Sequence, residues 1–562
     1  MSSRRAWAML VPIALAVAGC AGTAPSTSSA AAMSTSTPAS PGEACAGPEA
    51  SATPTGWWGD RVFYEVFVRS FADSDGDGIG DLRGLIAHLD DLNDGDPATT
   101  DDLGVTGLWL MPIAESPSYH GYDVVDYRAV ERDYGTAEDL RALVAAAHER
   151  GIAVILDLVI NHTSREHPWF VDARAPGSVH EDWYLWADDH PGIARSDGSR
   201  VWHPDGDRFY YGYFWEGMPD LALENPAVTA ELDGVADFWL DEMGVDGFRI
   251  DAARHLIEDG RKLENVDATF DWLAGFRGRI KDRHPEALVL GEVWDASSMA
   301  ARYVREGALD LTFDFGLASA TITSLRSGDG GAIRAALTEV TELYPDGGLA
   351  TFHTNHDQER LMTELGGDVE AAKEAASLLL TGAGTPFIYY GEEIGLSGTK
   401  PDERIRTPMR WDATPETAGF TSGRPWQPLG DDPIGTDVAS QRTDPDSLLS
   451  TYGDLIALRA AHPALGHGGL VPVRSSEASV VAFVRHAPDE TVLVVANVAE
   501  KPALSVSLDL QAGPLCGVTG VETLHGAVDA TAPTITTAGG FDGYVPVDEL
   551  GPRDVLVFGF VR

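Results

Sequence analysis

The sequence has few positive charges, no long internal repeat and, beyond its N-terminus, no apolar run long enough to span a membrane. Its 562 residues contain 40 Lys and Arg against 87 Asp and Glu, a formal net charge of −47. Such a charge repels nucleic acid and anionic lipid, so we expect a neutral or cationic partner. The 44% of hydrophobic residues and the 14 Trp indicate a globular protein with a large core, which excludes disorder for most of the chain.

The N-terminus has the pattern of an export signal. Two arginines precede the apolar segment Ala6 to Ala18, which is short for a bilayer span, and Cys20 follows a small residue. The letters "VAGC" resemble a bacterial lipobox, which implies lipid attachment at Cys20; an ordinary signal peptide is the alternative. The next segment is rich in Ala, Ser, Thr and Pro, as a tether is. We expect export, with the protein lipid-anchored at the bacterial cell envelope or secreted, and no other membrane contact.

The sequence contains two further cysteines, Cys45 and Cys516. In an oxidising compartment two such thiols can pair, which would link the start of the mature domain to its C-terminal region. The disulfide is an expectation, because a sequence does not give the distance between two thiols.

From Gly56 onward, short β-rich apolar segments alternate with segments of helical spacing. Repeated strand–helix–strand units imply a parallel sheet, and their number matches a closed (β/α)₈ TIM barrel. More than eighty residues separate the third and fourth strands, which predicts an inserted subdomain over the barrel mouth. The predicted strands cover residues 62–68, 104–113, 152–159, 244–251, 287–294, 309–315, 349–355 and 386–390.

After about residue 465 the helical spacing stops, and alternating segments such as "VVAFVRH" and "TVLVVANV" follow. They predict a separate antiparallel β-domain. We expect a monomer with a signal peptide (1–19), a tether (20–55), a barrel (56–162 and 225–465), an inserted domain B (163–224) and a C-terminal β-sandwich (466–562).

Polar side chains gather where the predicted strands end. In such a barrel the C-terminal strand ends meet at one mouth, which carries the chemistry. Taken singly, each side chain can be structural, as a helix cap or a core histidine. Convergence of Asp251, Glu292 and Asp357, from three strands, with an arginine and two histidines favours a shared site. The residues are Asp157, Asn161 and His162 after the third strand, Arg249 and Asp251 on the fourth, Glu292 on the fifth, and His356 and Asp357 after the seventh.

Arg249 and Asp251 lie two positions apart and therefore on the same side of a strand. Placing both there costs desolvation unless they are paired or used. Two carboxylates flanking one bond serve glycoside hydrolysis, one as nucleophile and the other as proton donor to the leaving oxygen. We interpret Arg249 as the group that keeps Asp251 ionised and aimed.

Four segments, "DLVINH", "GFRIDAARH", "GEVWD" and "FHTNHD", occur in this order. They resemble the four sequence regions of glycoside hydrolase family 13, the α-amylase family, and the resemblance covers nearly the whole mature chain. It implies that Asp251 is the nucleophile, Glu292 the general acid/base and Asp357 a third carboxylate that grips sugar hydroxyls. It also implies retention of the α configuration, with the carboxyl groups of Asp251 and Glu292 roughly 5 to 5.5 Å apart.

The same resemblance implies substrate-binding residues. Tyr122 would stack under the bound glucose, since an aromatic ring fits the apolar face of a pyranose. Arg406 of "RTPM" would contact the terminal glucose, and Arg254 with His255 resembles the Lys-His pair that touches leaving-side sugars in amylases. The residues expected to hydrogen-bond the glucose whose bond is cut are Arg249, His162 and His356.

Further motifs point to two branches of the family. "GTPFIYYGEEIGL" and "RTPMRWD" look like the oligo-1,6-glucosidase side, although Arg410 stands where Gln is usual. "SPSYHGYD" has Tyr119 where α-glucosidases usually hold a non-reducing end with an acidic residue. "MPDLA" resembles a motif of the subfamily intermediate between oligo-1,6-glucosidases and neopullulanases, with Ala222 replacing its Asn. We favour an α-amylase of this intermediate type, acting on α-1,4 bonds of starch and maltooligosaccharides.

Other functions stay open. An exo-acting α-glucosidase or oligo-1,6-glucosidase would use the same carboxylates. In a trehalose-synthase-like transglycosidase a sugar rather than water attacks the glycosyl-enzyme, and the motifs do not rank these outcomes. A glucan-binding lipoprotein without catalysis is disfavoured, because all three carboxylates are present.

The segment "DSDGDGIGD" places oxygen ligands at alternate positions, with glycines that permit a tight turn. This spacing suits Ca²⁺, and the loop resembles the calcium loop after the first strand in the oligo-1,6-glucosidase branch; a solvated acidic turn is the alternative. A second calcium at Asn161 stays open. The expected ligands of one structural Ca²⁺ are Asp73, Asp75, Asp77, the carbonyl of Ile79, and Asp81.

Overall fold

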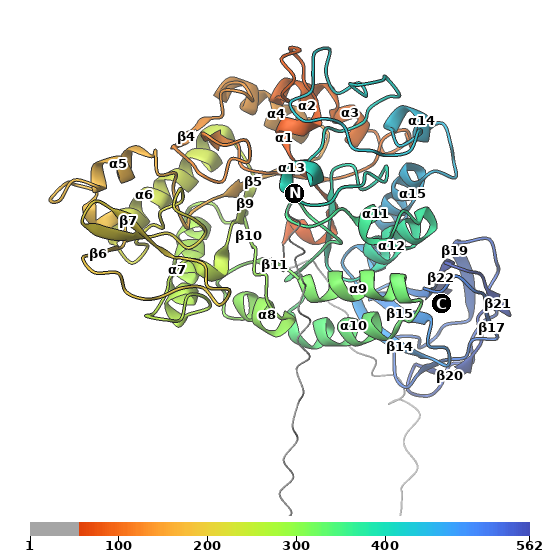
Figure 1. Cartoon of the computed structure of the whole chain (residues 1–562). Coiled ribbons are helices and arrows are strands. Elements are labelled where there is room, and N and C mark those ends of the chain that lie inside the picture. The colour runs from red at the N-terminus through yellow and green to blue at the C-terminus, as the bar shows by residue number, and fades with distance from the viewer. Residues whose placement is uncertain (1–55) are drawn as a thin grey trace, which may run out of the picture. The chain divides into compact units, whose positions relative to one another are not determined.

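The computed structural model describes residues 56–562; the predicted signal peptide, the tether, Cys20 and Cys45 lie outside this part. A closed barrel of parallel strands stands at the centre of the fold (Figure 1), with the strand order β1-β13-β12-β11-β10-β9-β5-β2. This arrangement confirms the predicted (β/α)₈ barrel, and each predicted strand overlaps an observed one. The barrel strands are β1 (Phe63–Val66), β2 (Gly107–Leu110), β5 (Ala153–Leu158), β9 (Gly247–Ile250), β10 (Leu288–Gly291), β11 (Leu311–Phe313), β12 (Leu349–Thr351) and β13 (Thr385–Tyr389).

Most of these strands are shorter than predicted, because apolar residues at their ends belong to turns. Gly104 and Gly244, for example, adopt left-handed backbone (φ 80° and 79°), so the extended conformation begins only after them.

The barrel interior is packed with side chains. Phe63 of β1 stacks on Phe387 of β13, with ring centroids 4.7 Å apart, inside a buried apolar cluster that includes Ile155. Because strand side chains alternate, the residues two positions further along point the same way but nearer the C-terminal mouth. On β1 and β5 those residues are Glu65 and Asp157, so the apolar interior ends in a polar layer.

Helices with well-formed N-terminal caps surround the barrel. Thr136 and Asp139 form a capping box at the start of α4, and the Asn225 side chain caps α6, which begins with Pro226. The longer helices are α4 (Ala137–Glu149), α6 (Pro226–Asp237), α7 (Asp267–Arg283), α8 (Ser297–Arg305), α9 (Phe315–Ser327), α10 (Gly331–Leu343), α12 (Val369–Thr381) and α15 (Leu448–Ala461).

Shorter elements occupy the connections. No helix within residues 56–562 combines the length and apolar character that a bilayer crossing requires. The short helices are η1 (Trp57–Asp60), α1 (Val68–Phe71), α2 (Leu82–Ala87), α3 (Leu89–Leu92), η3 (Phe238–Met243), η4 (Ala253–His255), α11 (Leu361–Glu364), α13 (Asp402–Ile405), α14 (Val438–Arg442) and α16 (Pro463–Gly466), and the strands β3 (Ala114–Glu115) and β4 (Asp126–Val130) form a hairpin-like pair.

The long connection between β5 and β9 forms a small aromatic-rich unit, at the left of Figure 1. The ring of Phe170 lies parallel to that of Trp186, with centroids 5.7 Å apart, and meets Tyr210 edge-on at 4.9 Å. These rings explain why a segment with little regular structure has a core. Its elements are α5 (Pro168–Ala173), η2 (Glu181–Trp183) and a sheet of β6 (Trp186–Ala187), β8 (Arg208–Tyr211) and β7 (Trp202–Asp205).

The C-terminal region is an antiparallel β-domain, as predicted, with its own apolar cluster. Cys516 is half-buried and disulfide-bonded; because Cys45 lies outside the described residues, their pairing stays a prediction. A seven-stranded sheet has the order β19-β22-β16-β15-β14-β18-β20, beside a β17–β21 pair. The strands are β14 (Gly469–Ser475), β15 (Val480–Ala487), β16 (Glu490–Asn497), β17 (Ala503–Leu504), β18 (Leu508–Leu510), β19 (Gly520–His525), β20 (Phe541–Tyr544), β21 (Glu549–Leu550) and β22 (Val555–Val561).

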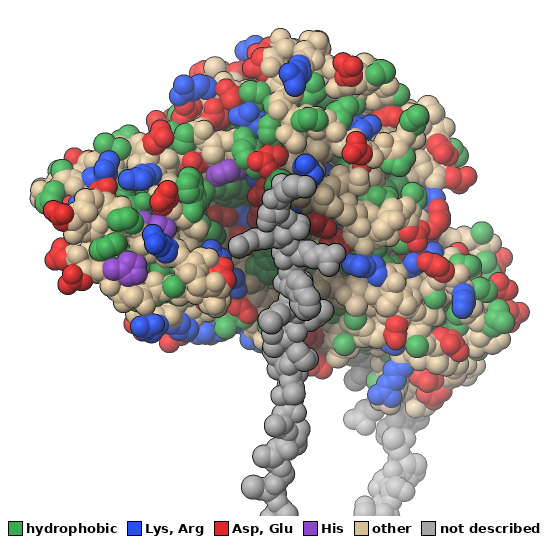
Figure 2. All heavy atoms as spheres, in the orientation of Figure 1, with side chains coloured by type: hydrophobic (Ala, Val, Ile, Leu, Met, Phe, Trp, Pro, Cys, Tyr) green, Lys and Arg blue, Asp and Glu red, His purple; other side chains and the backbone are tan. Residues whose placement is uncertain are grey.

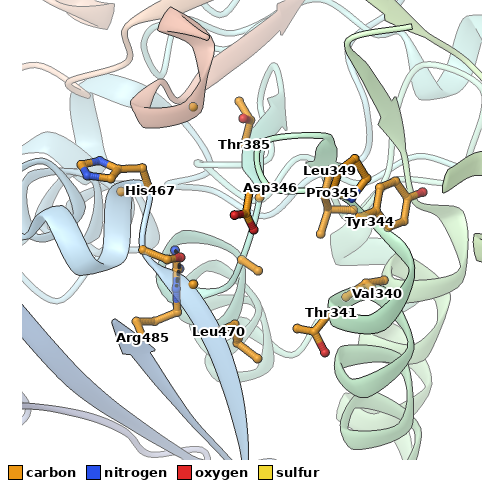
Figure 3. Close-up of a pocket in the computed structure, with 17 residues that line it drawn as sticks. Val340, Thr341, Tyr344, Pro345, Asp346, Leu349, Thr385, His467, Leu470 and Arg485 are labelled. Carbon is orange, nitrogen blue, oxygen red and sulfur yellow. Dashed lines mark hydrogen bonds between the residues drawn. The ribbon is translucent and has the colours of Figure 1, made fainter. Parts of the chain in front are cut away.

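A buried arginine of this domain binds the barrel, and a second buried arginine, from the barrel itself, binds beside it. Arg485 of β15 donates to the carbonyl of Thr381 (2.8 Å), and Arg459 of α15 donates to the carbonyl of Leu380 (3.0 Å). Both carbonyls belong to the last turn of α12, where unsatisfied carbonyls and the helix dipole favour positive charge. A cavity of about 190 Å³, with Arg485 and Thr385 in its wall, adjoins the junction (Figure 3). It lies at the N-terminal end of β13 and is separate from the polar layer.

Acidic side chains are spread over the visible face of the molecule rather than gathered in one patch (Figure 2). This distribution agrees with the net charge of −47, and the Lys and Arg side chains in view are interspersed among the acidic ones. A neutral polymer is compatible with such a surface, whereas a polyanion is not.

Candidate active site

Arg249 lies at the centre of the polar layer, and its side chain is fully buried. Its guanidinium forms ion pairs with three carboxylates, Asp157 (2.7 Å), Asp251 (2.6 Å) and Glu292 (2.9 Å). The barrel register produces this convergence: Arg249 is the direct neighbour of Asp157 on β5 and of Leu290 on β10, two positions before Glu292. One cation therefore holds three carboxyl groups from three strands. The sequence pattern predicted the pair with Asp251 but not those with Asp157 and Glu292.

Asp251 and Glu292 share this environment but differ in their hydrogen bonds. Burial raises the pKa of both carboxyl groups, and the charge of Arg249 opposes the shift. Asp251 also accepts a direct hydrogen bond from Arg249 (2.6 Å), which favours its ionised form. Glu292 accepts instead from the backbone N–H of Ala252 (3.1 Å), a residue held at φ 49°. The arrangement suits one carboxylate as nucleophile and one carboxyl group as proton donor.

Asp357 has two cationic neighbours. Its Oδ1 accepts from Arg406 (2.9 Å), and its Oδ2 lies 3.3 Å from Nε2 of His356. Burial favours the neutral form, but these two neighbours hold the pKa of Asp357 well below its usual value. Asp357 is therefore a fixed negative charge beside Asp251 and Glu292. Arg406, predicted to contact glucose, is buried and also donates to the carbonyl of His356 (2.9 Å).

His356 connects Asp357 to Glu65 on β1. Its Nδ1 lies 2.5 Å from Oε1 of Glu65, and its Nε2 lies 2.6 Å from the hydroxyl of Tyr122. That hydroxyl donates to Asp157 (2.8 Å), and the rings of Tyr122 and His356 are nearly parallel, with centroids 5.6 Å apart. Burial alone would lower the pKa of His356, but Asp357 and Glu65 raise it to about 10.

Glu65 was not among the predicted site residues, and Asp157 was placed at the strand end without a role. The signal for Glu65 is a charged residue at an inward position of a barrel strand, two places after Phe63. The strand direction and register that bring Glu65 to the site are not contained in the sequence motifs.

Three predicted sugar ligands are engaged with other protein groups. Both nitrogens of His162 have partners, the Tyr122 carbonyl (2.9 Å) and the Asn161 amide (3.2 Å), and burial lowers the pKa of His162 to about 4. His255 is stacked on a tyrosine ring and accepts from Nε of Arg254 (3.0 Å). Arg254 in turn donates to the carbonyl of Trp294. Direct contacts of these three residues with sugar stay predictions.

Two exposed aromatic rings lie close to Glu292 and His162. Trp294, two residues after Glu292, is 44% exposed and stacks on Phe315 with centroids 4.6 Å apart and an interplanar angle of 8°. Phe214, from the connection between β5 and β9, is 36% exposed and meets His162 edge-on at 5.2 Å. Such rings offer apolar faces to pyranose units beyond the catalytic carboxylates.

The predicted calcium loop brings three carboxylates together. Ligand oxygens of Asp73, Asp75 and Asp81 lie within 4.8 Å of one another, and within residues 56–562 none of the three forms an ion pair with a basic side chain. Asp77 is not in this group; its Oδ1 accepts from the backbone of Ile79 (2.8 Å). A cluster of hard oxygens without a positive partner fits a calcium ion.

The loop shape depends on glycine. Gly78 has φ 98°, and a Cβ at this position would lie 2.0 Å from the carbonyl oxygen of Arg424. The Gly78 carbonyl accepts from Trp426 (2.8 Å), and the Asp73 N–H donates to Phe420 (2.8 Å), so the segment 420–426 supports the loop. The segment 420–426 thus holds the backbone of the loop that carries the carboxylates.

Two buried oxygens also bear on the second calcium that the sequence left open. Among the residues that the structure describes, Oδ1 of Asn161 and Oδ2 of Asp220 have no hydrogen-bond partner. Burial raises the pKa of Asp220 well above its usual value. Two oxygens do not make the six to eight ligands that calcium takes, so this question stays open.

Comparison with known proteins places the chain among carbohydrate-active enzymes. The family model described as "Alpha amylase, catalytic domain" matches residues 65–468. The chain is 40% identical over 447 residues to Alpha-amylase 3 of Dictyoglomus thermophilum, covering 78% of this chain and 85% of the relative. It is 34% identical over 502 residues to the trehalose synthase of Thermus thermophilus, covering 78% of this chain and 50% of that relative.

Two further comparisons extend this result. Identity to the oligo-1,6-glucosidase of Parageobacillus thermoglucosidasius is 31% over 525 residues, covering 79% of this chain and 91% of the relative. The crystal structure of an α-amylase from H. orenii superposes with a TM-score of 0.76 at 39% identity, covering 89% of this chain and 99% of that one.

Proposed function

The chain belongs to the α-amylase family and is a glycosidase, and on this premise we propose that it is an α-amylase that cleaves α-1,4-glucosidic bonds with retention of configuration. The observation that carries the proposal is the buried Arg249, which holds Asp251 and Glu292 together at the barrel mouth beside the fixed charge of Asp357. This is the arrangement of carboxyl groups that two-step glycoside hydrolysis needs.

The reaction proceeds in two displacements. Glu292 gives its proton to the glycosidic oxygen while Asp251 attacks the anomeric carbon; the bond to the leaving sugar breaks and a glycosyl-aspartate forms. Glu292, now a carboxylate, then takes a proton from water, and the hydroxide attacks the same carbon and releases Asp251. Asp357 binds sugar hydroxyls and stabilises positive charge on the ring. The separation of roughly 5 to 5.5 Å between the two carboxyl groups stays a prediction.

Two observations favour an α-amylase over an exo-acting α-glucosidase. Sequence identity is 40% and 39% to the two α-amylases but 31% to the oligo-1,6-glucosidase. The exposed rings of Trp294 and Phe214 also offer binding surface for sugars beyond the bond that is cut, as a longer glucan requires.

Transglycosylation is the second candidate. A sugar held against Trp294 could replace water as the attacking group, and the trehalose synthase at 34% identity belongs to the same family. The catalytic carboxylates serve both outcomes, so the ratio depends on how well the mouth excludes water.

A chromogenic maltoheptaoside blocked at its non-reducing end tests the proposal. We expect rapid internal cleavage by the protein lacking residues 1–44, because an endo-acting enzyme does not need a free chain end. Glucose release from maltose or isomaltose without cleavage of the blocked substrate would instead establish an exo-acting glucosidase. Trehalose or longer oligosaccharides formed from maltose would establish transfer.

We also propose that the loop around Asp73 binds one structural Ca²⁺. Removal by a chelator is expected to lower the Tm, since an ion bound only by the folded state adds about 2.7 kcal/mol at a hundred times its Kd. Calorimetry with and without calcium measures the shift, with magnesium as the ion control. Asp73→Asn should abolish the calcium-dependent shift, and Asp77→Asn, whose side chain lies outside the cluster, should retain most of it. An unchanged Tm on chelation would contradict the site.

For the cellular location, we propose export with a lipid at Cys20 that tethers a monomeric enzyme to the cell envelope. The supporting features are the basic, apolar and small-residue order of the N-terminus and the low-complexity segment after it. Mass spectrometry of the mature N-terminus tests the lipid, and an unmodified N-terminus would leave the secreted form.

A further inference from the structure

Glu65 is a buried carboxylate that the two displacements described above do not use. It lies on β1 at an inward position, with 2% of its surface exposed, and its Oε1 is 2.5 Å from Nδ1 of His356. A hydrogen between these two atoms would make the contact favourable, and a hydrogen carried by Nδ1 would be donated to Glu65.

We propose that Glu65 is a positioning residue that keeps His356 doubly protonated, so that the second N–H of the ring orients Tyr122 and Asp357 for the reaction. Its catalytic consequence rests on the proposed function, whereas the protonation state of His356 does not.

The surroundings of Nε2 give the first reason. Nε2 is 2.6 Å from the Tyr122 hydroxyl and 3.3 Å from Oδ2 of Asp357. The Tyr122 hydroxyl already donates its only hydrogen to Asp157 (2.8 Å), so toward His356 it is an acceptor. Asp357, which accepts a hydrogen bond from Arg406 (2.9 Å), is an acceptor as well. Nε2 thus faces two acceptors and needs a hydrogen of its own.

The charges around the ring give the second reason. Carboxylates approach from three elements: Glu65 from β1, Asp157 through Tyr122 from β5, and Asp357 from the loop after β12, with Asp251 nearby. The cations that face the same region, Arg249 and Arg406, are themselves paired with carboxylates, and the edge of Trp109 closes the remaining side at 5.7 Å. A positive imidazolium balances this cluster, and within residues 56–562 Glu65 is the carboxylate that contacts Nδ1.

Loss of the Glu65 charge would therefore change the hydrogen bonds of Tyr122 and Asp357 through His356. A neutral His356 keeping its hydrogen on Nδ1 would present a bare Nε2, which can only accept. Tyr122 would then turn its hydrogen from Asp157 to His356, and Asp357 would lose a donor. The proton on His356 thus links Glu65, on barrel strand β1, to Tyr122 and Asp357, the two groups expected to contact sugar.

Glu65→Gln tests this relation, because it keeps the shape and one acceptor oxygen but removes the charge. The pKa of His356 should fall, because Asp357 remains but the second carboxylate that raises this pKa, Glu65, is lost. The basic limb of kcat/KM against pH, governed in the wild type by Glu292, should then steepen from one proton to two, with activity near pH 5.5 within a few-fold of wild type. A purely structural role would lower kcat/KM at every pH without changing the shape of the profile.

Glu393→Gln is the matched control. Glu393 is equally buried and accepts a hydrogen bond from Tyr64 (2.7 Å), the residue beside Glu65, but it does not contact His356. In Glu393→Gln the basic limb of kcat/KM against pH should keep the slope of a single proton. A wild-type profile shape in Glu65→Gln would overturn the proposal.

Nitrogen-15 NMR of histidine-labelled protein gives a readout that needs no substrate. In the wild type at pH 8, the signals assigned to His356 through a His356→Gln variant should show two protonated ring nitrogens. A neutral ring would overturn the proposal even if Glu65→Gln does not fold. If the wild type cleaves no glucan but the ring is doubly protonated, the proposed function fails while the assignment of the proton stands.

Discussion

Asp251→Asn is expected to lower kcat on the blocked maltoheptaoside by roughly 10⁵-fold, the scale seen when an enzyme loses its nucleophile. The amide has nearly the same size and can still accept from Arg249, so the site should keep its structure. What disappears is the carboxylate that forms the bond to the anomeric carbon. Kinetics at substrate saturation measure the loss, and calorimetry should show a nearly unchanged Tm.

Asp237→Asn serves as the control. Asp237 ends α6 on the outside of the barrel and pairs with Arg283 (2.7 Å) at the surface, where an ion pair contributes little. Its kcat should equal that of the wild type. An Asp251→Asn variant with more than about 1% of wild-type kcat would show that another group supplies the nucleophile.

Arg249→Met should cause the largest loss of stability, about 3 to 5 kcal/mol, because it leaves three buried carboxylates without their shared cation. Activity should fall as well, since Asp251 loses its hydrogen-bond donor. Arg249→Lys should be intermediate, because one ammonium cannot form all three contacts. Arg279→Met, which removes a partly exposed pair with Asp233, should cost at most about 1 kcal/mol.

The stability loss in Arg249→Met should depend on pH. Burial raises the pKa of Asp157 to about 7 in the folded protein, and those of Asp251 and Glu292 are raised as well. Groups whose folded pKa is raised contribute stability below the unfolded pKa of about 4 and lose it as pH rises through the folded value. Removing Arg249 raises these values further, so the Tm deficit should be larger at pH 8 than at pH 5. A deficit independent of pH would contradict the assigned coupling.

The barrel could be predicted from the sequence because each strand is a short apolar run bounded by turns. Few folds with a parallel sheet accommodate eight such strands that alternate with helices. It also identified the carboxylates, since the C-terminal strand ends must meet at one mouth. Strand limits were less accurate, because glycines such as Gly104 delay the start of the extended conformation inside an apolar run.

Other features depend on three-dimensional detail that a motif does not contain. The contact between Glu65 and His356 joins residues 291 positions apart and requires the inward register of β1. The exclusion of Asp77 from the acidic cluster depends on which way one side chain turns in a loop. Trp294 is part of a quoted motif, but its exposure follows from packing on Phe315.

The arginine contact at the C-terminal end of α12 makes the C-terminal sheet a structural part of the barrel. Arg485 comes from the sheet, yet the carbonyls that it satisfies belong to the helix that leads directly into β13. A shortened protein ending near residue 466 would leave those carbonyls without this donor and would expose the N-terminal end of β13. Exchange of sheet domains between relatives should therefore succeed only where the incoming sheet carries an arginine at this position, so the junction constrains how such enzymes can be recombined.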